Sequence, residues 1–314
     1  MTDRTVSNQI FSYLHSIGVD RVFLVPGGGN MFLVDAAATQ EGIEVVPTHH
    51  EQSAVIAAEY YSRKSGKIGL ALVTTGPGST NAVTGVAGAW LDSIPILVLA
   101  GQVKTGDLNI GSKLRQKGPQ EIDFVSMVSK ISKHSKTCTV ANECVSDIAR
   151  GVSIATSGRP GPVVFEIPLN VQSTIIGHNL GVAHPPTVVS NTDKGEMGNT
   201  VFDIFFQELR NSTRPIFLIG NGARVAQMDS KLRDLACKFG VPISMTWPTT
   251  DLLEFDHKLN AGRIGTVAKR FANINLQKSD FLVVFGSRLD PVLTAHNLNR
   301  FANRHVCFHS KTLS

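Results

Sequence analysis

The chain repeats one pattern several times: a short, continuously apolar run is followed at once by a turn rich in glycine or proline. The runs are "RVFLV" before "PGGGN", "IEVV" before "PTHHE", "IGLALVTT" before "GPGSTN" and "IPILVLA" before "GQ". Strands that are apolar on both faces are typical of a parallel sheet covered by helices, and a helical pattern follows the first three turns. The pattern therefore predicts a doubly wound domain with these turns at the carboxyl edge of the sheet, where such sheets bind ligands.

The length and composition allow two such domains. The 314 residues are 42% hydrophobic and 18% charged, which is enough for two cores. After "SGRPGPVVFEIP" the periodicity is lost, and it returns with the apolar runs "PIFLIG", "VPISMT" and "DFLVVFG". We predict the α/β class with two doubly wound parallel-sheet domains, the second of them Rossmann-like. The expected boundaries are residues 1–175, a linker at 176–197, and a second domain at 198–314 that ends in a polar tail.

Charge and hydropathy exclude several functions. The net charge of +5 is spread over the chain, so we expect no nucleic-acid partner. No apolar run reaches the roughly 18 residues that span a bilayer, so we expect a soluble, cytoplasmic protein without a membrane partner. The four cysteines form no CxxC pair, which argues against a disulfide framework or a zinc site.

Several of the turns are candidate ligand sites. "PGGGN" and "GPGSTN" both miss the dinucleotide fingerprint, because the third glycine position holds Phe32 in one and Asn81 in the other. Each turn alone is compatible with plain backbone geometry, but two on one sheet edge favour a ligand. In the second domain, "IGNGAR" and "GSRLD" are either ordinary ends of strands or part of a nucleotide site.

A carboxylate stands at the start of an apolar helix in "PTHHEQSAVIAA". A metal site formed by His49, His50 and Glu51 is disfavoured, because neighbouring side chains at a strand end point to opposite sides and no HExxH spacing is present. A glutamate that only complements the helix dipole would suit an exposed helix. Glu51 instead leads into small apolar residues, so we expect a buried carboxylate with a function. No G-x-S-x-G nucleophile motif is present.

At this point the motifs resemble a known family. The run from "HHEQSAVIAAEYY" to "SIPILVLAGQV", with "GVDRVFLVPGGG", "RQKGPQEIDFV" and "SGRPGPVVFEIPLNVQ", is similar to the pyrimidine-binding domain of thiamine diphosphate-dependent enzymes of the acetolactate synthase group. "RPIFLIGNGAR" and "AGRIGTVAKRFANINLQKSDFLVVFGSRLD" resemble the central domain of the same enzymes. The resemblance covers nearly all of residues 4–295.

The resemblance implies thiamine diphosphate as cofactor and Glu51 as the residue that activates it. The carboxyl group of that glutamate hydrogen-bonds N1′ of the pyrimidine ring and so promotes loss of the proton from C2 of the thiazolium ring. Burial would raise the pKa of such a carboxyl group and suit it to share a proton at neutral pH. The reaction implied is decarboxylation of a 2-oxo acid such as pyruvate, with transfer of the remainder to a carbonyl acceptor.

The same resemblance assigns the other site residues. The positions that line or approach the aminopyrimidine are Val25, Gly27, Gly28, Pro77 and Asn81. The positions near the substrate are Gln102 and Gln120. FAD, which acetolactate synthases hold in the central domain without redox chemistry, is an alternative second cofactor. Its candidate residues here are Gly220, Gly222 and Arg288.

Departures from the family pattern limit what the resemblance implies. Pro119 and Val25 stand where acetolactate synthases usually have aromatic residues, so the acceptor and the product stay open. The family binds the diphosphate through Mg²⁺ with a G-D-G motif and paired asparagines, and neither occurs in this sequence. We therefore expect no metal ligand in this chain and a diphosphate-binding domain supplied by a separate chain. This chain itself is expected to form a homodimer or homotetramer.

A non-catalytic function is the alternative hypothesis. A truncated relative could bind a partner or dimerise through its small-residue helices. The helix expected over residues 79–92 places Ala82, Gly85, Val86 and Ala89 on one face, which allows close approach to a neighbour.

Overall fold

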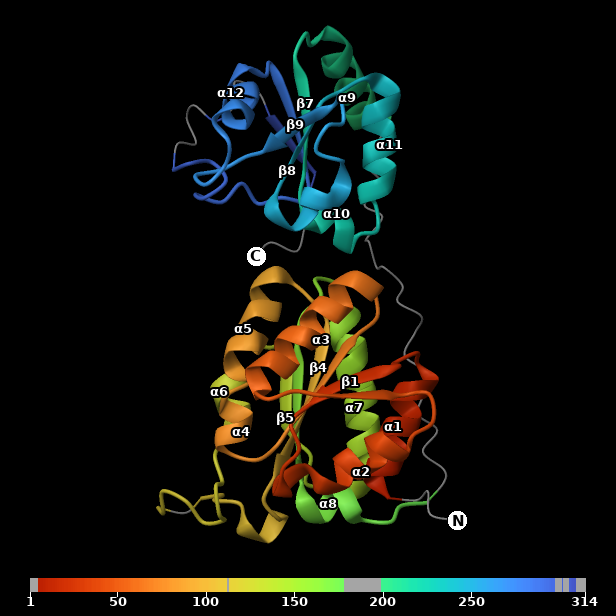
Figure 1. Cartoon of the computed structure of the whole chain (residues 1–314), viewed down its shortest axis with the longest axis vertical. Coiled ribbons are helices and arrows are strands. Elements are labelled where there is room, and N and C mark those ends of the chain that lie inside the picture. The colour runs from red at the N-terminus through yellow and green to blue at the C-terminus, as the bar shows by residue number, and fades with distance from the viewer. Residues whose placement is uncertain (1–4, 112, 178–198, 297–300, 302–304, 309–314) are drawn as a thin grey trace. The chain divides into compact units, whose positions relative to one another are not determined.

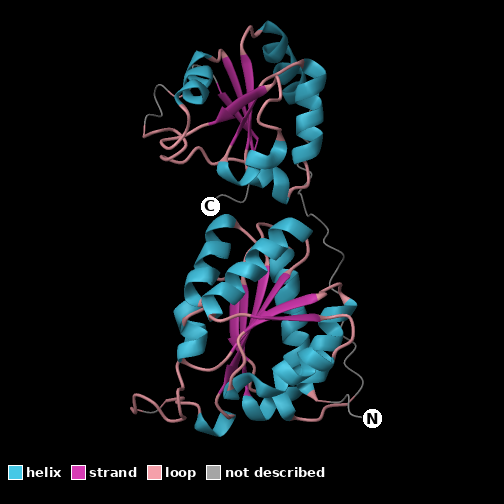
Figure 2. Cartoon of the chain, viewed as in Figure 1, coloured by secondary structure: helices cyan, strands magenta, loops and turns pink. Residues whose placement is uncertain are grey.

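The computed structural model describes residues 5–111, 113–177, 199–296, 301 and 305–308. The chain divides into two compact units, Met1–Val189 and Ser190–Ser314. Each unit is an α/β domain built on a parallel sheet, so the predicted fold class is confirmed (Figure 1, Figure 2). The linker expected at residues 176–197 lies outside the described residues from position 178 onward, and its limits remain a prediction.

The first unit alternates strands and helices. Its strands are β1 (Arg21–Leu24), β2 (Glu44–Pro47), β3 (Gly69–Val73), β4 (Ile96–Gln102), β5 (His134–Thr137) and β6 (Val163–Pro168). Its helices are α1 (Val6–Ser16), α2 (Met31–Thr39), α3 (Glu51–Ser65), α4 (Pro77–Thr80), α5 (Val83–Asp92), α6 (Phe124–Val128), α7 (Ala141–Thr156) and α8 (Leu169–Ser173), with 3₁₀ turns η1 (Gly28–Asn30) and η2 (Thr105–Asp107).

The order of the strands locates the crevice of this sheet. All neighbouring pairs are parallel, in the order β2-β1-β3-β4-β6-β5. The chain winds from β1 to β2 in one direction and continues from β3 on the other side of β1. Ligands of doubly wound sheets bind beyond the carboxyl ends of the strands at such a switch point. The turns "PGGGN" and "GPGSTN" follow β1 and β3, so they meet at this place.

Helices cover both faces of the first sheet, which explains the continuously apolar strands. In β3, Leu70 and Leu72 face the core formed with α1, α2 and α7. Ala71 and Val73 alternate with them and face the core formed with α3, α5 and α6. Figure 1 shows these two groups of helices on opposite sides of the strands.

The small-residue face of the second group is used within the unit. The segment expected as one helix over residues 79–92 is two helices, α4 and α5. A Cβ added to Gly85 would lie 2.7 Å from Cβ of Val55, so glycine lets α5 approach α3 closely. The close neighbour of this face is thus α3 of the same chain, and the face offers little to the dimerisation hypothesis.

The second unit has its own sheet. Its strands are β7 (Pro215–Ile219), β8 (Ile243–Met245), β9 (Asn260–Arg263), β10 (Phe281–Phe285) and β11 (His305–Phe308), in the order β11-β10-β7-β8-β9 and all parallel. Its helices are α9 (Asn199–Asn211), α10 (Asn221–Val225), α11 (Asp229–Phe239) and α12 (Arg270–Lys278), with a 3₁₀ segment η3 (Trp247–Leu252). Its switch point lies between β7 and β10.

Some details of the second unit differ from the sequence expectation. Gly240 ends α11 with φ of 68°, as the sequence pattern of a helix near residues 229–239 followed by glycine predicts. The sequence pattern also predicts a helix near residues 266–275, whereas α12 begins only at Arg270. The expected polar tail is wrong at His305–Phe308, because these residues pair with β10 as a strand. Val306 and Cys307 are exposed, which is compatible with a strand at the edge of the sheet.

Candidate functional site

The turn after β1 is held in place by the side chains of Asn30 and Thr74, which form hydrogen bonds with its backbone. Asn30, which is fully buried, accepts from the N–H of Gly27 at 2.8 Å and donates to the carbonyl of Val25 at 3.1 Å. The N–H of Gly29 donates to Oγ1 of Thr74 at 3.2 Å. A Cβ on Gly27 would lie 2.5 Å from the same Oγ1, so this position requires glycine. Gly28, by contrast, is exposed and has open space around it.

Glu51 lies where the turns meet. It is the first residue of α3, and Nδ2 of Asn81 donates a hydrogen bond to its Oε2 at 2.9 Å. A Cβ on Gly78 would lie 3.1 Å from its Oε1, so the absence of a side chain at Gly78 leaves this oxygen accessible. The carboxyl group is half-buried, not buried as expected, because it sits at the open end of the helix.

Thr74 connects the two turns, and no sequence motif singles it out. It follows β3 directly and contacts Gly27 on one side, while a Cβ on Gly78 would lie 2.6 Å from its Cγ2. A β-branched residue between a buried strand and a glycine turn is a weak signal, but it was present in "LVTTGPG". Thr74 therefore fixes the distance between the glycine turn after β1 and the turn next to Glu51.

Gln120 is brought to the same turn through its backbone. Its φ is 60°, and its carbonyl packs so closely on Gly76 that a Cβ there would lie 1.9 Å from the oxygen. Pro77 follows as the first residue of α4. The side chain of Gln120 is exposed. The structure thus places Glu51, Asn81, Pro77 and the backbone of Gln120 around one turn.

Gln102 differs from the other candidates because its side chain is only 2% exposed. Its amide oxygen accepts from the N–H of Val103 at 2.8 Å. Its amide nitrogen donates to the carbonyl of Ile122 at 3.0 Å and to Oε1 of Glu166 at 2.8 Å. Both ends of the amide are therefore engaged by protein groups.

Two domain models match the chain, and together they cover most of it. Residues 4–127 match the thiamine pyrophosphate enzyme N-terminal TPP binding domain, and residues 203–312 match the thiamine pyrophosphate enzyme central domain. This chain belongs to the thiamine pyrophosphate enzyme family. Thiamine pyrophosphate is the same compound as thiamine diphosphate, so the resemblance seen in the motifs is confirmed at the level of the family.

Curated relatives in this family include acetolactate synthases from bacteria and plants. The large subunit from Lactococcus lactis is 32% identical over 288 residues, which are 90% of this chain and 48% of the relative. The acetolactate synthase isozyme 3 large subunit of Escherichia coli is 31% identical over 296 residues, which are 93% of this chain and 50% of the relative. The chloroplastic acetolactate synthase of Arabidopsis thaliana is 32% identical over 293 residues, which are 93% of this chain and 42% of the relative. The chain spans about half the length of these relatives.

The histidines before Glu51 have a structural explanation. His50 caps α3, because its Nδ1 accepts a hydrogen bond from the N–H of Gln52 at 3.2 Å. His49 is exposed. Within the described parts of this thiamine pyrophosphate enzyme chain, no group of three or more His, Cys, Asp or Glu side chains could hold a metal ion, and no helix is long and apolar enough to cross a membrane.

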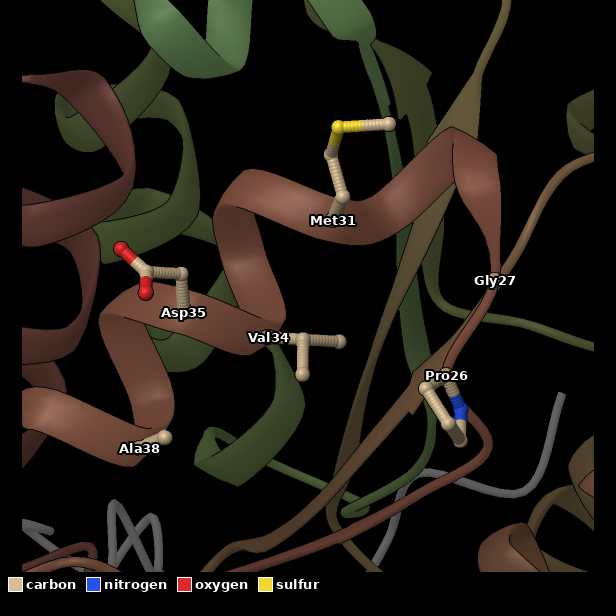
Figure 3. A pocket seen from close by; sticks show the side chains of 6 residues that line it. All are labelled: Pro26, Gly27, Met31, Val34, Asp35 and Ala38. Carbon is tan, nitrogen blue, oxygen red and sulfur yellow. The ribbon is translucent and has the colours of Figure 1, made fainter.

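A hollow of about 560 Å³ lies beside the glycine turn, on the side of α2 (Figure 3). Its lining is Pro26, Gly27, Met31, Val34, Asp35 and Ala38. It shares Gly27 with the candidate site but does not include Glu51, Pro77 or Asn81. We place the site at Glu51, because the hollow is lined mainly by one helix and offers one carboxylate, Asp35, without a partner group for a cofactor ring.

In the central domain, the predicted glycines bring two turns together. The N–H of Gly222 donates to the carbonyl of Gly286 at 2.9 Å, and a Cβ on Gly222 would lie 2.8 Å from Cα of Gly286. A Cβ on Gly220 would lie 2.6 Å from the same carbonyl oxygen. Arg288 is exposed. This packing explains both glycines without a ligand, and FAD remains a prediction from the resemblance.

Proposed function

We propose that this chain provides the pyrimidine-binding half of an acetolactate synthase-like enzyme. The reaction is decarboxylation of a pyruvate-like 2-oxo acid and transfer of the remainder to a carbonyl acceptor, and Glu51 activates the cofactor. The observation behind the proposal is the half-buried carboxyl group of Glu51, with one oxygen bonded to Asn81 and the other facing the side-chain-free Gly78.

The groups around Glu51 suit the aminopyrimidine ring. Asn81 fixes Oε2, while no hydrogen bond from the described residues reaches Oε1. A carboxyl group held in this way keeps its orientation and can still share a proton with a ring nitrogen. The glycine turn after β1 offers backbone without side chains, which allows a flat ring to come close. Val25 and Pro77 are the apolar side chains that we assign to the faces of the ring.

Thiamine diphosphate, when bound, supplies the carbon nucleophile and the electron sink for breaking a bond next to a carbonyl group. The protein has to hold a proton at Oε1 of Glu51, to orient the ring, and to keep water from the reacting atoms. Asn81 keeps the carboxyl group in place, and Thr74 keeps the two turns at a fixed distance. Gln120 is the polar residue that we assign to the substrate, since its backbone packs on the same turn.

We further propose that the diphosphate and its Mg²⁺ are bound by a diphosphate-binding domain that lies outside residues 1–314. The sequence lacks the motif that serves this purpose in the family, and the curated relatives are about twice as long as the part that this chain matches. Two of these relatives are named large subunits, which supports an assembly of several chains. A homodimer or homotetramer is the arrangement that we expect.

Calorimetric titration with thiamine diphosphate and Mg²⁺ tests the proposal. The full chain is titrated alone and then together with a diphosphate-binding domain from one of the acetolactate synthases. We expect tight binding only in the mixture, and release of carbon dioxide from pyruvate by the mixture. Glu51→Gln should lower this release by at least about a hundredfold, within the range typical of a general acid–base group.

Glu41→Gln is the matched control, because Glu41 is an exposed glutamate of the same unit outside the site. It should leave binding and turnover unchanged. Carbon dioxide release that survives Glu51→Gln would refute the role of Glu51. Absence of cofactor binding in both the single chain and the mixture would instead support the non-catalytic alternative.

A further inference from the structure

Two buried polar side chains lie side by side on neighbouring strands of the first sheet. Gln102 ends β4 and Glu166 lies in β6, and each is 2% exposed. The amide nitrogen of Gln102 donates to Oε1 of Glu166 at 2.8 Å, and the hydroxyl of Thr137 in β5 donates to Oε2 at 2.9 Å. Buried polar groups with several partners of this kind fix a local structure, because breaking any bond leaves a desolvated group.

The side-chain amide of Gln102 forms hydrogen bonds with both ends of a largely exposed segment, residues 103–122. Its oxygen accepts from the N–H of Val103, where the segment begins, and its nitrogen donates to the carbonyl of Ile122, where the segment ends. The segment between these two residues includes Gln120. One buried side chain therefore holds the start and the end of this segment next to each other.

Glu166 determines the orientation of the side-chain amide of Gln102. An ionised carboxylate only accepts hydrogen bonds, so it selects the nitrogen of Gln102 and leaves the oxygen toward Val103. Burial raises the pKa of Glu166 to about 7, and Asp123 is the charged neighbour that adds to this rise. When the acid is protonated, the hydroxyl of Thr137 can turn and accept the proton, so the bond to Gln102 is kept in both states.

The segment reaches the candidate site through Gln120. The carbonyl of Gln120 packs against Gly76, directly before Pro77 and the turn that contains Asn81. The backbone of Gln120 has a positive φ, which is costly for this residue type and persists only when the surroundings hold it. Release of the segment ends would remove this support.

We propose that Gln102 and Glu166 are positioning residues that hold Gln120 against the Gly76 turn. Neither needs to touch the cofactor or the substrate, which gives Gln102 a different role from the one that the resemblance implied. The importance of this positioning for catalysis rests on the proposed function, but the positioning itself is a property of the folded chain.

Amide hydrogen exchange of the full chain, without cofactor, tests the proposal. Peptides from residues 103–122 report the segment, and peptides from β3 report whether the unit is folded. Gln102→Leu and Glu166→Ala should each speed exchange in the segment by about tenfold or more, because each removes buried hydrogen bonds, while β3 stays protected. Glu166→Gln keeps an oxygen for Gln102 and should stay within about threefold of the unchanged chain.

Asp147→Asn is the matched control, since Asp147 is a buried carboxyl group on α7, against the opposite face of the sheet. It should leave exchange in the segment unchanged. The proposal would be overturned if exchange in the segment were unchanged in Gln102→Leu while β3 stayed protected. It would also be overturned if Glu166→Gln sped up exchange in the segment as much as Glu166→Ala. If Gln102→Leu does not fold, the comparison of the two Glu166 variants decides. Because no cofactor is present, these outcomes are independent of the activity test on Glu51.

Discussion

Glu166 links the stability of the first unit to pH. Burial raises its pKa to about 7, above the ordinary value of 4.5. The folded state therefore binds more protons than the unfolded state between these two values, so the stabilising contribution of the neutral acid is complete below pH 4.5 and is lost as pH rises through about 7. The full loss corresponds to about 3 kcal/mol of unfolding free energy.

We predict that Glu166→Gln removes this part of the pH dependence. Urea unfolding followed at pH 5, 6, 7 and 8 should show that the variant gains stability relative to the unchanged chain as pH rises. Burial lowers the pKa of His134, so that group contributes with the opposite sign, and the difference between the two proteins isolates Glu166. Glu41→Gln, at an exposed position beside β2 at the opposite edge of the sheet, should keep the slope of the unchanged chain. Parallel pH profiles for the unchanged chain and Glu166→Gln would contradict the prediction.

Site residues could be predicted from the sequence where a motif points to them. A contact between side chains on different strands could not be predicted. Glu51, Asn81 and Pro77 lie together as the motifs predict, since all three follow the carboxyl ends of strands on either side of β1. The partner of Gln102 is Glu166, which lies far along the chain in the run "SGRPGPVVFEIP", and no motif connects the two residues. Register between strands decides such a contact, and a sequence pattern does not contain the register.

At the scale of elements, the inner strands were predicted and three edge strands were missed. β5, β9 and β11 each lie at the edge of a sheet, and none of them has the continuous apolar run of β3 or β4. Apolar runs indicate strands that are covered on both faces by helices, and an edge strand is covered less and includes polar residues. The signal used to find strands therefore fails at these three strands for a physical reason, whereas the edge strand β2 has the apolar run "IEVV" and was predicted.

We predict that the α3–α5 contact distinguishes two glycines of one helix. Gly85→Ala places a Cβ 2.7 Å from Val55, and this overpacking should lower the unfolding free energy by about 1–2 kcal/mol, even after the gain in helix propensity. In Gly88→Ala the nearest atom is Oε2 of Glu59 at 3.3 Å, at the end of a flexible side chain. That control should be neutral or more stable by up to about 1 kcal/mol. Urea midpoints that change equally in both variants would show that α3 and α5 are not in close contact.

At the scale of the whole molecule, the two units repeat one architectural principle. Each has a parallel sheet whose strand order reverses next to its first strand, at β1 and β3 in one unit and at β7 and β10 in the other. Glycine turns meet at both switch points. A carboxylate at the start of a helix, Glu51, distinguishes the first of these points, and at the second the glycines pack against each other.

Separate sheets and separate cores predict that each unit unfolds as its own cooperative structure. The chain contains two tryptophans, Trp90 in the first unit and Trp247 in the second, so each unit has its own fluorescent reporter. In Trp247→Phe, the fluorescence of Trp90 should follow the larger unit and depend more steeply on urea, because the slope increases with the surface that unfolding exposes. In Trp90→Phe, the remaining tryptophan should show a shallower transition with a different midpoint. Circular dichroism of both variants should show the sum of the two transitions, since helices lie in both units. If both tryptophans report one midpoint and one slope, the units unfold together, and the variants described above would then report on the stability of the whole chain.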